Sequence, residues 1–135
     1  MSFSRRWLLL AAAAAWSLPA PLDAAPEGAG AMGRLRSLMG PPASARVIGS
    51  AYLERFPQEA EASTLLPLIL DGLVLVEPEA AALGAAALRG RLAAGLRADF
   101  ANGRVVDVGG WLLSRTEARL CAAWALPGAT GEAAF

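Results

Sequence analysis

Three carboxylic acids, Asp99, Asp107 and Glu117, lie within one short stretch of this 135-residue chain. Two carboxyl groups held at different pKa values can serve as a general acid and a general base. Each of the three also has a local structural explanation: Asp99 as a solvated helix residue, Asp107 as a turn residue and Glu117 as a helix cap. We favour the structural explanation and predict no catalytic residue.

Other residues that commonly carry chemistry are scarce. The chain has no histidine, and Cys121 is its single cysteine. The lack of histidine excludes imidazole ligands for zinc or haem, and Ser-His or Cys-His catalysis, within this chain. A lone cysteine cannot form an internal disulfide, and in an apolar helical stretch we expect it to be buried, with a reactive thiol as the alternative. The sequence therefore predicts no cofactor and no metal site.

The charged residues balance to a formal net charge of zero and are interspersed along the chain. No basic block is present, which argues against nucleic-acid binding. Arg115 and Arg119 are four positions apart, so they share one face of a helix. We expect Arg119 to pair near Glu117 or with Asp99, and an anion site is the weaker alternative. The glycines do not form a phosphate-binding loop.

The N-terminus has the layout of an export signal. Ser4, Arg5 and Arg6 stand directly before an apolar run at residues 7–18. That run suits a signal peptide but is shorter than the about 20 apolar residues that a membrane-spanning helix needs, so no permanent span is predicted. Small residues follow, and Ala29 and Ala31 form an A-x-A site that predicts cleavage after Ala31.

The leader resembles the twin-arginine family of export signals, whose usual form is S-R-R-x-[FL]-[LK]. Ser4, Arg5, Arg6, Leu8 and Leu9 match this form. The resemblance implies recognition by the twin-arginine (Tat) translocase and delivery to the periplasm. It also implies that the chain folds before it crosses, often with a cofactor or bound to a partner. An ordinary secretory signal with two arginines is the alternative.

The rest of the chain suits one domain. We predict a signal peptide at 1–31, a linker at 32–43, a helical domain at 44–127 and a flexible tail at 128–135. Apolar residues at helical spacing predict helices over 45–56, 59–76 and 78–100, with Pro67 kinking or restarting the second, and a last helix over 115–126. The predicted fold is mainly α, a small orthogonal bundle of about four helices with a short β-hairpin before the last helix.

The periodicity changes after residue 103. Residues 104–113 are rich in β-branched and aromatic residues around a pair of glycines. This pattern predicts two short strands with a turn at 107–110, and Trp111 anchoring the hairpin to the helices. Ser114 and Glu117 then have the spacing of a capping box, which predicts the start of the last helix.

Residues 65–76 are apolar on more than one helical face. Such a helix is either the central core element or exposes an apolar patch to another protein. The candidate partner surface consists of Leu65, Leu66, Ile69, Leu73, Trp111 and Trp124.

A second resemblance covers residues 99–104, 110–114 and 116–121. These segments resemble the C-terminal block of small exported proteobacterial proteins with twin-arginine leaders. Some of these are similar to the small subunits of periplasmic flavin-dependent gluconate, fructose and sorbitol dehydrogenases. The resemblance implies a small subunit that binds no cofactor, pairs with a large flavoprotein and assists its maturation and co-export. It carries no catalytic residue to this chain.

These observations predict a non-catalytic exported accessory subunit, or an export escort, of a periplasmic oxidoreductase. The alternative is a free-standing periplasmic binding or structural protein. An enzyme is the least favoured class, because no nucleophile motif, paired cysteine or histidine is present.

Overall fold

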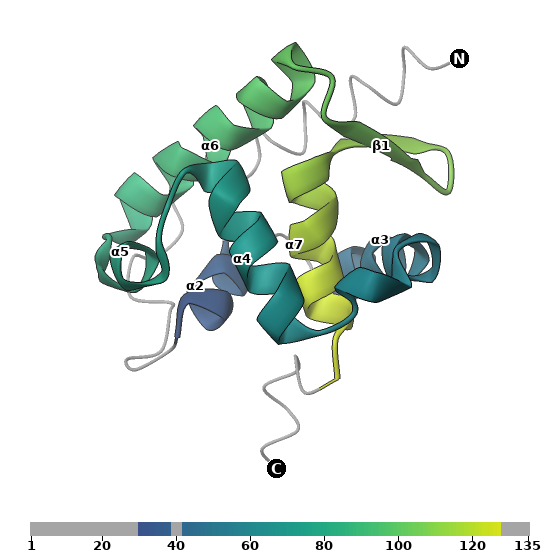
Figure 1. The fold of residues 1–135 in the computed structure, drawn as a ribbon, viewed down its shortest axis with the longest axis horizontal. Helices are drawn as coiled ribbons and strands as arrows, with labels where there is room; N and C mark the ends of the chain where they lie inside the picture. The colour runs from purple at the N-terminus through teal and green to yellow at the C-terminus, as the bar shows by residue number, and fades with distance from the viewer. Residues whose placement is uncertain (1–29, 39–41, 128–135) are drawn as a thin grey trace.

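Six α-helices and one two-stranded hairpin make up the part of the chain that the structure describes (Figure 1). The computed structural model describes residues 30–38 and 42–127. The prediction of a mainly helical domain with a hairpin before the last helix is confirmed. The elements in chain order are α2 (Ala31–Ser37), α3 (Pro42–Arg55), the 3-10 helix η1 (Pro57–Glu59), α4 (Ala62–Leu73), α5 (Glu77–Ala82), α6 (Ala85–Ala101), β1 (Val105–Val108), β2 (Trp111–Ser114) and α7 (Arg115–Ala125).

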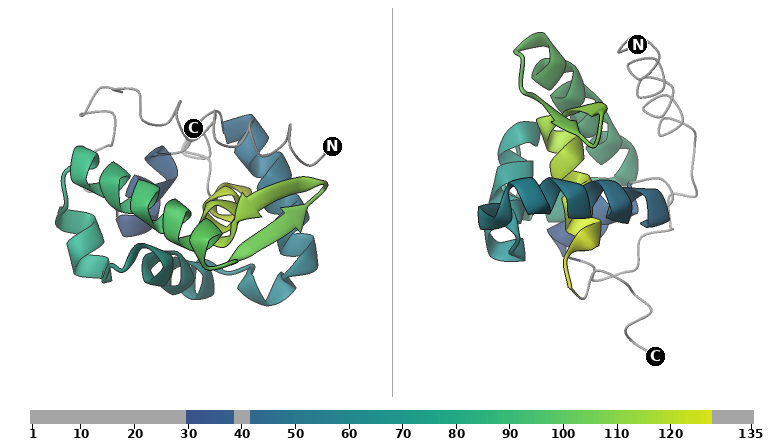
Figure 2. Two further views of the ribbon diagram at one scale, coloured as in Figure 1. Left: turned by 90° about the horizontal axis from the view of Figure 1, so that it is seen from above. Right: turned by 90° about the vertical axis from the view of Figure 1, so that its right-hand side faces the viewer.

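Helix α7 lies at the centre of the fold, and the other elements are arranged around it (Figures 1 and 2). Helices α2, α3, α4 and α6 and both strands contact it. Its small side chains allow this close packing, and most of its residues are buried. The most extensive contact is with α3, where a Cβ atom on Gly49 would lie 2.1 Å from the carbonyl oxygen of Cys121. Glycine at position 49 is therefore required for the two helices to approach this closely.

The predicted hairpin is confirmed in position and turn. Strands β1 and β2 pair antiparallel, with Val108 opposite Trp111, and are joined by Gly109 and Gly110. Both glycines have positive φ, at 57° and 86°, as a two-residue hairpin turn requires. The Asp107 carboxylate accepts a hydrogen bond from the Gly110 amide at 2.9 Å, which confirms Asp107 as a turn residue.

The residue that anchors the hairpin differs from the prediction. Val106, Val108 and Leu113 share the inner face of the hairpin and are buried against the helices. Trp111 lies at the end of that face and is 38% exposed. The anchor is thus a set of aliphatic side chains, and Val108, which pairs with Trp111, is buried at the same end of the hairpin.

The predicted linker at 32–43 is wrong over its first part, which forms helix α2. Met32, Leu35 and Leu38 recur every three residues, and this spacing places them on one side of a helix that packs into the core. Arg36 donates from Nε to the Ala123 carbonyl, and the Trp124 indole donates to the Arg36 carbonyl. The predicted cleavage point after Ala31 therefore falls inside a helix whose first residue is buried.

The predicted helix 59–76 is shorter in the structure, where α4 runs unbroken from Ala62 to Leu73 with Pro67 inside it, and Glu59 belongs to η1. The predicted helix 78–100 is divided into α5 and α6. Arg34 of α2 explains this division, because its guanidinium donates to the carbonyls of Ala80 at 2.9 Å, Ala81 at 2.7 Å and Leu83. These carbonyls would otherwise lack partners at the end of α5. The contact comes from a distant segment, so local periodicity could not reveal it.

Candidate functional site

The most highly connected polar group of the described residues is the Glu59 carboxylate, which ends η1 and is only 4% exposed. Arg119 donates to it from Nε at 2.9 Å and Nη2 at 3.4 Å, and Arg115 donates from Nη2 at 3.2 Å. The Tyr52 hydroxyl donates to Oε1 at 2.8 Å and accepts from Arg115 Nε at 2.9 Å. We call Glu59, Tyr52, Arg115 and Arg119 the Glu59 cluster.

The cluster joins α3, η1 and the first turns of α7. Arg115 and Arg119 share a face of α7, as their spacing predicts, but the carboxylate between them is Glu59. The predicted pairing of Arg119 with Asp99 or near Glu117 is therefore wrong. Arg115 also stacks on Phe56, with its guanidinium carbon 4.2 Å from the ring centroid. Stacking and hydrogen bonding together hold this cation in place at the edge of the core.

Burial on its own would raise the pKa of Glu59, but hydrogen bonds from Arg119, Tyr52 and Arg115 outweigh it and hold that pKa below its ordinary value. The pKa of Tyr52 is raised, by burial first and by its hydrogen bond to Glu59 second. Both carboxylate oxygens of Glu59 are thus occupied by donors, and the group stays ionised. This arrangement suits a structural ion cluster, and the lowered pKa makes Glu59 a poor general base at neutral pH.

Asp99 is the second buried acid, at 1% exposure, so the prediction of a solvated helix residue is wrong. Its Oδ1 accepts from Arg104 Nε and its Oδ2 accepts from the Thr116 backbone amide, both at 2.9 Å. The second contact places a negative charge at the N-terminus of α7, where it is favoured. Burial would raise the pKa of Asp99, but hydrogen bonds from Thr116, Arg104 and Ser114 hold it below its ordinary value.

Glu117 takes the capping role that the sequence predicts. Its backbone amide donates to Ser114 Oγ at 3.0 Å, and the Ser114 backbone amide hydrogen-bonds its carboxyl group. Burial is the stronger influence and raises the pKa of Glu117 to about 7. Cys121, one turn further along α7, is buried as expected, and burial raises the pKa of its thiol to about 12. A thiol with this pKa is protonated at neutral pH and is a poor nucleophile.

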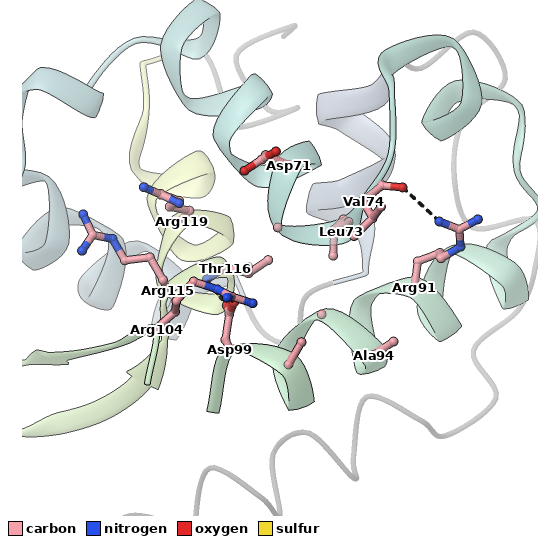
Figure 3. Close-up of a pocket in the computed structure, with 13 residues that line it drawn as sticks. Asp71, Leu73, Val74, Arg91, Ala94, Asp99, Arg104, Arg115, Thr116 and Arg119 are labelled. Carbon is pink, nitrogen blue, oxygen red and sulfur yellow. Dashed lines mark hydrogen bonds and ion pairs between the residues drawn. The ribbon is translucent and has the colours of Figure 1, made fainter. Parts of the chain in front are cut away.

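A pocket of about 560 Å³ lies between α4, α6 and the start of α7, and we call it the α4–α6 pocket (Figure 3). Small residues of α6 and the last turn of α4 form its apolar walls, and arginines surround it. Figure 3 shows Arg104 beside Asp99 at one end and Arg91 near Val74 at the other. The lining residues are Asp71, Gly72, Leu73, Val74, Arg91, Ala94, Gly95, Ala98, Asp99, Arg104, Arg115, Thr116 and Arg119.

Val74, at the rim of this pocket, is the only described non-glycine residue with positive φ, at 54°. It ends α4 in the left-handed conformation that glycine or asparagine usually adopts at this position. The amide of Leu75 closes the turn on the Leu70 carbonyl, and Arg91 Nη1 donates to the Val74 carbonyl at 3.1 Å. The Val74 side chain is 80% exposed and that of Val76 is 64% exposed. A strained, exposed β-branched residue often marks a functional position.

Most of the predicted partner surface lies in the core instead. Leu65, Ile69 and Leu73 are fully buried on the inner face of α4, and Leu66 is partly buried beside them. Trp124 is partly buried, with its indole bound to α2. Helix α4 is thus apolar on several faces because it packs against α6, α7 and η1. Trp111 is the one predicted member that the structure leaves exposed.

Residues 30–38 and 42–127 contain no group of three or more acidic or cysteine side chains placed to hold a metal ion. No helix among them is both long and apolar enough to cross a bilayer. The predicted export residues Ser4, Arg5, Arg6, Leu8, Leu9 and Ala29 lie outside the described residues.

Comparison with known proteins found no family model, no curated protein and no solved structure that matches this chain.

Proposed function

We propose that this chain is a non-catalytic accessory subunit that is exported together with a periplasmic oxidoreductase. The feature that best supports a partner-binding role is the loop between α4 and α5. There Val74 and Val76 project into solvent, and Val74 keeps a backbone conformation that disfavours its side chain. A valine at a position better suited to glycine is explained if its side chain contacts another protein.

The buried acids support the non-catalytic part of the proposal. Glu59 and Asp99 each have both oxygens occupied by donors from neighbouring elements, and Glu117 closes the first turn of α7. These groups have structural partners that account for their burial. The oxidoreductase partner and the periplasmic destination rest on the resemblances in the leader and in residues 99–121.

Replacing Val74 with glycine tests the loop directly. We expect Val74→Gly to raise the free energy of unfolding by about 0.5–1 kcal/mol, because glycine removes the left-handed strain at some cost in chain entropy. Urea unfolding of the purified protein measures this change. Val76 is extended, with φ −103°, so Val76→Gly is the matched control and should instead lower stability.

Partner capture from the periplasm tests the functional part. The tagged full-length chain should retain one large protein that has flavin absorbance and dehydrogenase activity. Both Val74→Gly and Val76→Gly should reduce its recovery by about fivefold or more, since each removes an apolar contact. Val47→Ser, which alters an exposed valine on α3, should leave recovery unchanged. A chain that stays monomeric, or equal recovery with all three variants, would contradict the proposal.

A further inference from the structure

We propose that the α4–α6 pocket binds a small amphiphilic carboxylate, with its aliphatic part along α6 and its carboxylate at Arg104. This inference goes beyond the proposed function and does not depend on the partner protein. It rests on the size of the pocket, its apolar wall and the excess of guanidinium groups over buried carboxylates at one end.

The size and wall of the pocket suit an aliphatic ligand. Its volume of about 560 Å³ lies within the range of about 300–1,000 Å³ that is usual for small-molecule sites. Ala94, Gly95 and Ala98 form the α6 wall and offer no polar side-chain atom. A Cβ atom on Gly95 would lie 2.8 Å from the Gly72 carbonyl oxygen, so α6 and α4 meet closely at these two glycines, which both line the pocket.

At the end of the pocket near Arg104, guanidinium groups outnumber the buried carboxylates. Three guanidinium groups, those of Arg104, Arg115 and Arg119, face two buried carboxylates, those of Asp99 and Glu59. Arg104 uses only Nε for Asp99, and both of its Nη atoms are without a hydrogen-bond partner among residues 30–38 and 42–127. A ligand carboxylate could accept from them, and charge-assisted hydrogen bonds of this kind are strong.

The other two charged residues that line the pocket, Arg91 and Asp71, determine which way the ligand would lie. Arg91 is occupied, since it donates to the Val74 carbonyl and lies 3.7 Å from Glu79. Asp71 is exposed on the α4 wall and forms no ion pair with any described residue. Its charge would repel an anion, so removing that charge should strengthen binding if the ligand is a carboxylate.

Titration with octanoate, followed by amide chemical shifts of the 15N-labelled protein, tests the inference. We expect saturable shifts at residues 94–99 and 104 with a dissociation constant of about 1 mM. Arg104→Gln should weaken binding about tenfold, through loss of the charge-assisted contact. Arg97→Gln is the matched control, because Arg97 is an exposed arginine of α6 that does not line the pocket.

Two further variants keep the test independent of the Asp99–Arg104 ion pair. Ala94→Leu fills the pocket from an exposed helix position and should abolish binding while the protein stays folded by circular dichroism. Asp71→Asn should tighten binding. The inference is overturned if octanoate shows no saturable shifts, if octylamine binds as tightly as octanoate, or if Arg97→Gln weakens binding as much as Arg104→Gln. Weaker octanoate binding by Asp71→Asn, or equally tight binding of inorganic phosphate, would also overturn it.

Discussion

Replacing Glu59 with glutamine is expected to lower the free energy of unfolding by about 3 kcal/mol. The substitution leaves Arg115 and Arg119 together at the edge of the core without the carboxylate that holds both. We place the loss near the lower end of the range for broken buried pairs because both arginines keep some solvent contact. Urea unfolding at neutral pH measures the change.

A nearby acid provides the matched control for Glu59. Glu61 is exposed, and its side chain does not cap α4. Glu61→Gln makes the same chemical change two residues away and should alter stability by less than about 0.5 kcal/mol. Equal effects from the two substitutions would show that the Glu59 cluster contributes little to stability.

The Glu59 prediction also fixes a pH dependence. The pKa of Glu59 is lower in the folded protein than in the unfolded chain. Its contribution to the free energy of unfolding is therefore fully present above the pKa of the unfolded chain, and it is lost as the pH falls through the pKa of the folded protein. Asp99 behaves in the same way. We therefore expect the wild-type protein to lose stability in acid, and Glu59→Gln to lose less over the same pH range.

Glu117 is expected to give the opposite pH dependence. Its folded pKa of about 7 lies above the ordinary 4.5, so the folded protein binds the proton more tightly and loses stability as the pH rises between these values. Glutamine keeps the capping geometry but does not ionise. The stability of Glu117→Gln relative to wild type should therefore rise by about 3 kcal/mol between about pH 4.5 and pH 8.5.

Unfolding curves of the two proteins across this pH range measure the difference, and other titrating groups cancel in the comparison. Glu77→Gln serves as the control, because Glu77 is exposed in the first turn of α5. The free energy of unfolding of Glu77→Gln should change with pH in the same way as that of wild type over the whole range. If the free energy of unfolding of Glu117→Gln also changed with pH as that of wild type does, the Glu117 carboxyl would not have the raised pKa that its burial implies.

The features that the sequence predicts correctly are those set by neighbouring residues. The glycine pair at 109 and 110 is needed for the hairpin turn, and Ser114 and Glu117 are spaced to cap the next helix. The burial of Cys121 follows from its place in an apolar helical stretch. In each case the residues involved lie within one or two turns of each other.

The features that were missed depend on contacts between distant segments. Glu59 resembles an ordinary acid in the first turn of a helix, and only the return of α7 brings Arg115 and Arg119 to it. The spacing of these two arginines was the available indication that they share a partner. Helix α2 was obscured by the glycine and prolines at 40–42, although Met32, Leu35 and Leu38 already had helical spacing.

The proposed partner surface shows the same limit. Hydrophobicity placed it on four residues of α4 together with Trp111 and Trp124, but the α4 residues are buried or partly buried. The structure instead exposes Val74 and Val76 in the loop that follows α4. The left-handed conformation of Val74 could not be predicted, since valine at this position contradicts the usual preference for glycine.

We propose that this chain takes a partner oxidoreductase out of the cytoplasm by means of its own arginine pair. The most direct test replaces Arg5 and Arg6 with lysines in the full-length chain and measures both proteins in the periplasmic fraction, with an Arg89→Lys, Arg97→Lys double variant as the control. We predict that the leader variant abolishes delivery of the chain and of its partner, and that the control delivers both normally. Undiminished arrival of the partner dehydrogenase in the periplasm with the leader variant would contradict the account.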